Sequence, residues 1–212
     1  MDSIALAYAL AVGIGYLLGS SPNGYLVARA RGIDIRKHGS GNIGATNVLR
    51  TLGKKWGYLV FALDMFKGFA AVRIAFAIGG AFLIGDAQHD LIGIAGGLAC
   101  ILGHTFPVWL GFHGGKGVAT SAGVLLGLMP IAVFSVMAVW LLLFQLTRYV
   151  SVASIAGAIA LPVFVIVYLH FGMLTGPNLL PFSILIAAVV VWRHRSNIKR
   201  LLQGKEQRFS QK

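Results

Sequence analysis

The chain has 212 residues, of which 57% are hydrophobic and only 11% are charged, and its mean hydropathy is +0.80. Soluble domains carry about a quarter charged residues, so this composition excludes a soluble fold and predicts one integral-membrane domain over residues 1–212. The net charge is +12, and the basic residues lie mainly in short loops and a short tail. The sequence has no basic helix face and no zinc-ligand spacing, which argues against a nucleic-acid partner.

Apolar runs separated by short polar loops indicate an all-α membrane protein with seven transmembrane helices. A helix needs about 20 residues to cross a bilayer. The candidate spans are residues 4–18, 57–84, 91–109, 118–128, 131–146, 150–171 and 179–192. The fourth is short, and Pro130 leaves open whether it separates the fourth and fifth spans or bends a single long helix.

The basic residues predict the orientation of these spans. Seven spans place residues 29–55, 112–117, 147–149 and 193–212 on one face, and these segments hold every Lys and Arg except Lys67 and Arg73. The opposite face carries acidic residues, Asp2, Asp86 and Asp90, and no Lys or Arg. Because Lys and Arg concentrate in cytoplasmic loops, we expect the N-terminus outside and the C-terminus in the cytoplasm.

The first cytoplasmic loop, residues 39–50, combines glycines with groups that bind an oxyanion. Ser40 and Thr46 offer hydroxyl donors, and Asn42 and Asn47 offer amide donors. Arg50 can bind a phosphate through two parallel N–H bonds. The alternative is structural, a helix cap followed by an amphipathic helix at the membrane interface.

Charged residues interrupt the second span. Asp64 and Lys67 are three residues apart, which places them on one helix face and predicts a local ion pair. Arg73 lies deeper in the span, and the sequence leaves open whether it extends to the outer surface or meets an acidic partner.

The second cytoplasmic loop contains a glycine-rich segment, Gly114-Gly115-Lys116-Gly117, followed by Val118, Ala119 and Thr120. Glycines let backbone N–H groups approach an anion, and Lys116 adds a positive charge ahead of a helix N-terminus. The spacing does not match a Walker A loop, because only three residues separate Gly111 from Gly115. A glycine-rich turn with a lysine that extends to the interface is the alternative.

His104, near the end of the third span, is a candidate for orienting phosphate or acting as a general base. A hydrogen-bonded structural role at the end of the span is the alternative.

The start of the sixth span and the C-terminal tail add further polar groups to the same face. Ser151 and Ser154 are three residues apart and can face one cavity, although small-residue helix packing explains them equally well. The tail contains His194 and Asn197 among basic residues that also suit lipid headgroups.

The chemistry predicted for this face uses no metal and no cofactor. It carries no acidic cluster for two-metal chemistry, and the single cysteine, Cys100, lies in an apolar run. We therefore expect catalysis by positioning and electrostatics.

These motifs resemble the PlsY family, the bacterial acyl-phosphate:glycerol-3-phosphate acyltransferases. Over nearly the whole chain, the matching segments are residues 39–47, 104–120 and 193–206. The resemblance implies a multi-pass enzyme of the bacterial cytoplasmic (inner) membrane with its active site on the cytoplasmic side. It implies that an acyl chain moves from acyl phosphate to the 1-hydroxyl of glycerol 3-phosphate, giving lysophosphatidic acid and phosphate for phospholipid synthesis.

With this resemblance, the candidate residues divide between two substrates, and membrane lipids are the remaining partners. We expect Ser40, Asn42, Thr46, Gly115, Lys116 and Gly117 at the donor phosphate and carbonyl, and Arg50, Lys116, His194 and Asn197 at the acceptor phosphate. Catalytic roles are expected for Ser40, Asn42, His104, Lys116 and Asn197, and substrate contacts also for Asn47, Gly114, Thr120, Ser151 and Ser154. Either the donor phosphate or His104 accepts the hydroxyl proton. A transporter or flippase of a phosphate-bearing lipid is the alternative function, although the spans show no sustained repeat.

Overall fold

The computed structural model describes residues 3–209, apart from the side chains of residues 86 and 87. Asp2 and the Asp86 side chain, both named in the predicted orientation, therefore lie outside the described part. Within residues 3–209 the fold is entirely helical and contains no strand, which confirms the predicted all-α class. The chain divides into two compact units, Met1–Leu128 and Met129–Lys212.

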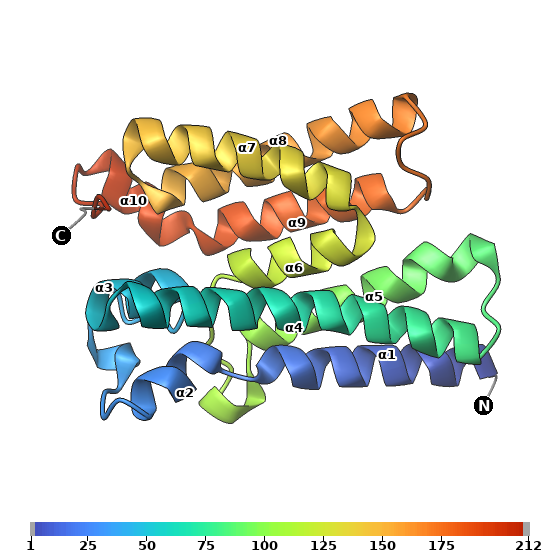
Figure 1. Cartoon of the computed structure of the whole chain (residues 1–212), viewed down its shortest axis with the longest axis horizontal. Coiled ribbons are helices and arrows are strands. Elements are labelled where there is room, and N and C mark those ends of the chain that lie inside the picture. The colour runs from blue at the N-terminus through green and yellow to red at the C-terminus, as the bar shows by residue number, and fades with distance from the viewer. Residues whose placement is uncertain (1–2, 210–212) are drawn as a thin grey trace. The chain divides into compact units, whose positions relative to one another are not determined.

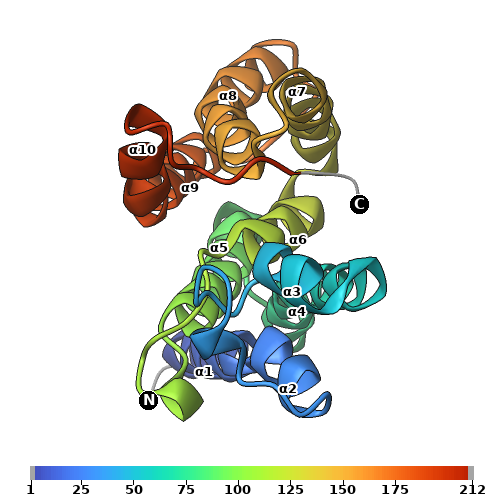
Figure 2. The same cartoon turned by 90° about the vertical axis from the view of Figure 1, so that its left-hand side faces the viewer.

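The first unit contains six α-helices and two single-turn 3-10 helices within residues 3–128. They are α1 (Ser3–Ser20), α2 (Asn23–Arg29), η1 (Ile35–Lys37), α3 (Ala45–Leu52), α4 (Lys54–Ala81), α5 (Asp86–Thr105), η2 (Val108–Leu110) and α6 (Val118–Leu128). The short helices α2 and α3 and the segment around η2 gather at the end of the unit where α4 starts (Figure 1). Figure 2 looks onto this end and shows α3 beside α4, against which it packs.

Small residues allow the long helices of this unit to approach closely. Helix α1 buries Ala7, Ala11, Gly15 and Gly19, each four residues from the next, on its face toward α5. A Cβ added at Gly15 would collide with the carbonyl oxygen of Gly96 in α5. Helices in a membrane pack mainly through such close backbone contacts, because lipid provides no hydrophobic drive for their association.

Helix α6 begins deep in the unit, beside the middle of α4. Gly68 of α4 packs against the carbonyl oxygen of Thr120, and Gly123 packs against that of Met65. Residues 65–68 lie three to four turns from the start of α4, or roughly 17–21 Å along its axis. Helix α6 has only 11 residues because its first turn already lies well inside the unit.

The second unit contains four α-helices within residues 129–209. They are α7 (Pro130–Thr147), α8 (Val150–His170), α9 (Leu179–Arg193) and α10 (Arg195–Leu202). Helix α8 packs against both α7 and α9, and α10 turns away from α9 by 54°. Helix α6 ends at Leu128 and α7 begins at Pro130, so Pro130 separates two helices rather than bending one. Proline suits the first turn of a helix, where its missing N–H would have no partner.

All seven apolar segments correspond to helices, but not all of these helices qualify as membrane spans by length and composition. Among the described residues, four helical segments qualify: Ser3–Arg29, Gln88–Leu110, Pro130–Thr147 and Val150–His170. The bent pair Leu179–Arg193 and Arg195–Leu202 makes a fifth if it forms one span. Helix α6 is too short, and the 28-residue α4 carries Asp64, Lys67 and Arg73 within its apolar part.

Candidate active site

One amide side chain, that of Asn47, holds the loop between α2 and α3 in shape. The Asn47 Nδ2 group donates to the carbonyl oxygens of His38 and Asn42, both at 2.9 Å. The Asn47 Oδ1 atom accepts from the backbone N–H of Ser40 at 3.0 Å. Because the Asn47 amide is only 3% exposed and is used within the loop, it organises Ser40 and Asn42, and its direct contact with substrate stays a prediction.

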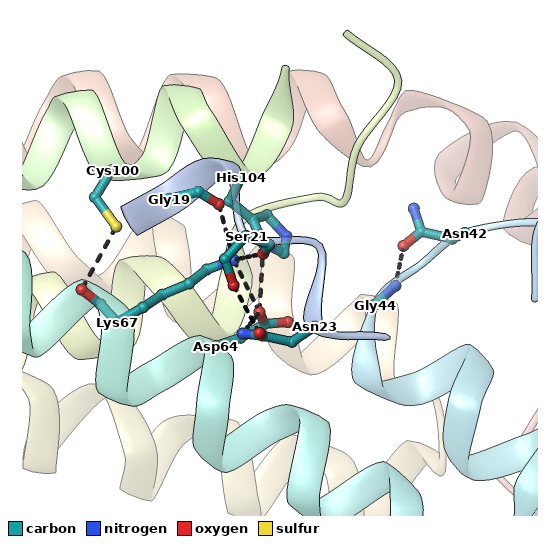
Figure 3. Close-up of polar contacts among 9 residues, drawn as sticks. All are labelled: Gly19, Ser21, Asn23, Asn42, Gly44, Asp64, Lys67, Cys100 and His104. Atoms are coloured by element: carbon teal, nitrogen blue, oxygen red, sulfur yellow. Dashed lines mark hydrogen bonds and ion pairs between the residues drawn. The ribbon is translucent and has the colours of Figure 1, made fainter. Parts of the chain in front are cut away.

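Asn42 leads the loop into α3. Its Oδ1 atom accepts from the backbone N–H of Gly44 at 2.7 Å, a local turn that asparagine favours (Figure 3). Thr46 and Arg50 are four residues apart in α3 and therefore share one face of the helix. The structural alternative for this loop was a helix cap followed by a helix. The helix, α3, is present, but no side chain caps its N-terminus. Ser40 and Arg50 are exposed, so both side chains are accessible from solvent.

Asp34 and Arg36 form an ion pair at the start of this loop. Arg36 Nη2 lies 2.8 Å from Asp34 Oδ2, and Arg36 Nε lies 2.9 Å from Asp34 Oδ1. The hydrogen bond from Arg36 lowers the pKa of Asp34 from 3.8 to about 2. Asp34 is therefore ionised at neutral pH and leaves Arg36 paired.

Residues 114–117, here called the glycine cradle, are attached to the end of α5 by backbone hydrogen bonds. The Gly114 N–H donates to the carbonyl oxygen of Thr105, and the Gly115 N–H donates to that of His104, both at 3.1 Å. Gly117 has a φ of +79°, a conformation that side chains with a Cβ rarely adopt. Lys116 is thereby held, half-buried, immediately before the N-terminus of α6.

Buried hydroxyl groups lie around the start of α6. Thr120 is fully buried, and Ser121 and Thr105 are 4% and 2% exposed. Their hydroxyl oxygens have no hydrogen-bond partner among the described residues. Gly117 is the nearest part of the glycine cradle, since a Cβ there would lie 3.5 Å from Thr105 Oγ1 and 3.8 Å from Ser121 Oγ. Thr120, a predicted substrate contact, is buried at the start of α6, and its contact with substrate stays a prediction.

His104 is buried beside a charged pair in the interior of this unit. Lys67 Nζ lies 3.0 Å from Asp64 Oδ1, which confirms the predicted ion pair. His104 Nδ1 lies 3.7 Å from the same carboxylate oxygen (Figure 3). Asn23 Nδ2 also donates to Asp64 Oδ1, at 3.1 Å. His104 is 5% exposed, which suits the structural alternative better than a residue open to substrate.

The two loops of this unit share a hydrophobic core. Ile35, Ile43 and Val48 from the first loop and α3 are buried together, and Leu110 of η2 packs against the cluster that they form. Packing of these apolar side chains holds the segment before the glycine cradle against the first loop.

Glu206 binds two of the predicted residues of the second unit, Ser151 and Asn197. Its Oε1 atom accepts hydrogen bonds from Ser151 Oγ at 2.9 Å and Asn197 Nδ2 at 2.6 Å. Its Oε2 atom accepts from Arg200 Nε at 2.7 Å. Burial alone raises the pKa of Glu206, but the hydrogen bonds from Asn197, Arg200 and Ser151 outweigh it and lower the pKa. These four residues are called the Glu206 cluster.

Two further predicted residues of the second unit have structural partners. His194 is 3% exposed, and its Nδ1 atom lies 2.8 Å from the carbonyl oxygen of Val190. A carbonyl can only accept, so Nδ1 carries the hydrogen, which fixes the imidazole tautomer. Ser154 Oγ accepts a hydrogen bond from Trp140 Nε1 at 3.2 Å, so it joins α7 to α8.

The structure thus places the predicted residues in two sets. The first unit holds Ser40, Asn42, Thr46, Asn47, Arg50, His104, Gly114, Gly115, Lys116, Gly117 and Thr120, and the second holds Ser151, Ser154, His194 and Asn197. Glu206 belongs to the family-like tail segment, but no site role was predicted for it, although an isolated acid in a strongly basic tail was a signal. Residues 3–209 contain no group of three or more His, Cys, Asp or Glu placed to bind a metal.

Comparison with known proteins gives consistent matches over most of the chain. A family model described as glycerol-3-phosphate acyltransferase matches residues 9–204. The glycerol-3-phosphate acyltransferase of Desulforudis audaxviator is 47% identical over 207 residues, covering 97% of this chain and 98% of the relative. That of Aquifex aeolicus is 46% identical, covering 92% and 95%.

Solved structures of PlsY are similar in both sequence and fold. One, an integral membrane glycerol 3-phosphate acyltransferase in its glycerol 3-phosphate form, aligns with a TM-score of 0.84 and 44% identity over 96% of each chain. Another, in a lysophosphatidic acid form, aligns with a TM-score of 0.82 and 43% identity over 96% of this chain and 95% of the other.

Proposed function

Because the chain belongs to the glycerol-3-phosphate acyltransferase family, we propose that it transfers an acyl chain from acyl phosphate to the 1-hydroxyl of glycerol 3-phosphate. The products are lysophosphatidic acid and inorganic phosphate. The glycerol 3-phosphate and lysophosphatidic acid forms of the similar PlsY structures support the acceptor and the lipid product. Family membership also favours acyl transfer over the transporter alternative.

The glycine cradle is the observation that carries this proposal. Both substrates are phosphates, and the cradle presents Lys116 between glycines at the N-terminus of α6. Two backbone hydrogen bonds to the end of α5 hold it in place. A cation placed ahead of a helix N-terminus stabilises a phosphate, and preorganised electrostatic stabilisation is usually the largest single contribution to catalysis.

In the bilayer, we place all seven apolar helices as spans of the bacterial cytoplasmic membrane. Helix α4 is long enough to span, and its two central charges, Asp64 and Lys67, are paired with each other, as charges inside a membrane usually are. Arg73 is exposed near the far end of α4, with its guanidinium over the ring of Phe76. The basic loops put the glycine cradle on the cytoplasmic side, recessed from the surface because α6 starts beside the middle of α4.

The residues divide between the two phosphates as follows. Ser40, Asn42, Thr46 and the glycine cradle hold the donor phosphate and its carbonyl, with Asn47 and Thr120 shaping these two segments. From the sequence resemblance we assign Arg50, His194 and Asn197 to the acceptor phosphate, and Ser151 and Ser154 to substrate contacts. Lys116 is shared, because its charge serves whichever phosphate is closer at the moment of transfer.

Acyl phosphate is an activated donor, so the reaction needs no enzyme nucleophile. The acceptor hydroxyl oxygen attacks the acyl carbonyl carbon, an ester C–O bond forms, and the C–O bond to phosphate breaks. The hydroxyl proton passes to an oxygen of the donor phosphate, which leaves as inorganic phosphate. We favour the donor phosphate over His104 as the base because His104 is buried behind Gly115. Lys116 and the cradle N–H groups stabilise the charge that develops on the leaving phosphate.

The decisive measurement is release of inorganic phosphate from palmitoyl phosphate by the detergent-solubilised protein. We expect release that depends on glycerol 3-phosphate and yields lysophosphatidic acid in equal amount. Parallel assays with acyl-CoA and acyl carrier protein test the donor, and neither should support the reaction. Phosphate release that does not require glycerol 3-phosphate, or transfer from acyl-CoA alone, would contradict the proposal.

A further inference from the structure

The first unit buries two opposite charges and a histidine in its interior, away from the exposed polar loops. Asp64, Lys67 and His104 are 2%, 6% and 5% exposed. Removing charges from water is costly, and a buried ion pair contributes little net stability compared with apolar packing. This group therefore calls for an explanation other than stability.

The Lys67 ammonium group and one carboxylate oxygen of Asp64 each have several polar neighbours. Lys67 Nζ donates to the carbonyl oxygens of Gly19 at 2.9 Å and Ser21 at 2.8 Å, in addition to its contact with Asp64. Asp64 Oδ1 accepts from Asn23 and faces His104 (Figure 3). The pair thus connects α4 to the end of α1, the start of α2 and the end of α5. The contacts of Asp64 Oδ1 with Lys67 and Asn23 hold the carboxylate in position.

His104 connects this fixed carboxylate to the glycine cradle. One side of the imidazole faces Asp64, with Nδ1 3.7 Å from Oδ1. The other side lies against Gly115, where an added Cβ would collide with Nε2. The backbone carbonyl of His104 also accepts the Gly115 N–H at 3.1 Å. His104 therefore contacts the residue next to Lys116 through both its ring and its backbone.

We propose that His104 is a positioning residue for the glycine cradle, and that Asp64 and Lys67 hold its ring in place. The inference rests on the proposed role of the cradle in binding a substrate phosphate. A ring locked between Asp64 and Gly115 sets the distance of the Gly115 and Lys116 backbone from the end of α5. Displacements of about 0.5 Å in such groups are enough to lower catalysis, so a rigid support explains the buried charges.

A double-mutant cycle between His104→Ala and Gly115→Ala tests the ring contact. In the wild-type background the methyl group of Gly115→Ala meets a ring that cannot move, and we expect kcat/KM to fall at least about tenfold. In the His104→Ala background the methyl group has room, and the same change should cost less than about threefold. Thermal unfolding of each variant in detergent should show the same pattern.

Gly114→Ala is the matched control, because its methyl group would collide with backbone carbonyls of His104 and Thr105 and with the Pro107 ring. Removal of the His104 side chain relieves none of these contacts. Gly114→Ala should therefore be equally harmful in both backgrounds. Equal costs of Gly115→Ala in the two backgrounds would overturn the proposal.

The steady-state constants of His104→Ala separate positioning from base catalysis. A loosened cradle should raise KM for a substrate while kcat falls less than about tenfold. Loss of an essential general base lowers kcat by about 10² to 10⁴. A kcat loss in that range with unchanged KM would show that His104 acts on the reacting atoms and would overturn a positioning role.

Asp64→Asn, Lys67→Met and their double variant test the support of the ring. Each single variant leaves one buried charge uncompensated, so both should be strongly destabilised. The double variant should recover thermal stability but keep a kcat/KM at least about tenfold below wild type, because His104 loses its partner. Recovery of activity together with stability would show that the pair only supports the fold. If the single variants do not fold, the double variant and the double-mutant cycle of His104→Ala with Gly115→Ala still test the positioning role.

The two proposals can fail separately. If the wild-type protein shows no acyl transfer that depends on glycerol 3-phosphate, the proposed function is wrong. The unfolding measurements would still report the contact between His104 and Gly115. Active wild-type protein in which Gly115→Ala is not relieved by His104→Ala would remove only the positioning role.

Discussion

The glycine cradle and the Glu206 cluster hold their polar groups by different means. The cradle is attached by two backbone hydrogen bonds to α5 and packs against the buried ring of His104. The Glu206 cluster depends on one carboxylate that accepts hydrogen bonds from Ser151, Asn197 and Arg200. Backbone contacts survive most side-chain changes, whereas the cluster loses all its contacts with one residue. The first arrangement holds the backbone around one cation, Lys116. The second brings together side chains from distant positions in the sequence.

Lys116→Ala should have the largest effect. It removes the cation from the cradle, and we expect kcat/KM to fall well beyond tenfold, a loss of roughly more than 1.4 kcal/mol of transition-state stabilisation. Thermal unfolding should change little, because the backbone holds the cradle. Lys199→Ala, on the exposed face of α10, is the control and should retain activity. A wild-type rate for Lys116→Ala would contradict the assignment of the cradle.

Glu206→Gln should affect stability and activity together. The amide keeps the size of the side chain but turns an N–H₂ group toward one of the three donors that Glu206 now binds. An unsatisfied buried donor costs about 1 to 3 kcal/mol, which we expect as a lower unfolding temperature in detergent. Gln203→Ala, exposed in the same tail, is the control. A variant as stable as wild type but less active would show that Glu206 contacts substrate rather than organising the cluster.

The pH dependence of unfolding should report on the Glu206 cluster, whose contacts depend on an ionised carboxylate, and not on the glycine cradle, which backbone hydrogen bonds hold. The folded pKa of Glu206 lies below its unfolded value, so the unfolded state binds more protons between these values. The contribution of the cluster is therefore fully present above the ordinary glutamate pKa and is lost as pH falls through the lowered value. Wild type should lose stability over this range relative to Glu206→Gln. Parallel pH curves for the two proteins would contradict the hydrogen-bonded carboxylate.

Asp34→Asn should have the smallest effect. Its ion pair with Arg36 lies at the exposed surface of the first loop, where solvent and salt screen the attraction. We expect unfolding temperature and kcat/KM to remain within experimental error of wild type in assays at neutral pH. A clear loss of activity would instead assign Arg36, freed from its partner, an influence on substrate binding.

Helices and polar loops were predictable because their signals are local. The runs of apolar residues predicted every long helix, and Val118–Leu128 was located to the residue. The spacing of Asp64 and Lys67 predicted their ion pair, since three residues place two side chains on one helix face. The number of spans and their orientation stay predictions.

The roles of individual polar residues were less predictable because they depend on distant partners. Asn47 resembles a substrate ligand in the sequence, but its amide is used by backbone groups of residues 38–42. Ser151 and Glu206 are 55 residues apart in the chain and meet only after folding. No periodic pattern of residues in the sequence indicates such a contact.

The sequence by itself determined a membrane-embedded helical protein and predicted phosphate-binding loops, because composition, apolar periodicity and the order of glycines and cations are properties of the chain. Only the tertiary structure decided that α6 starts deep beside α4, that His104 lies between Asp64 and Gly115, and that Glu206 binds Ser151 and Asn197. These facts follow from close backbone packing and from hydrogen bonds between remote segments, whose geometry exists only in the folded chain.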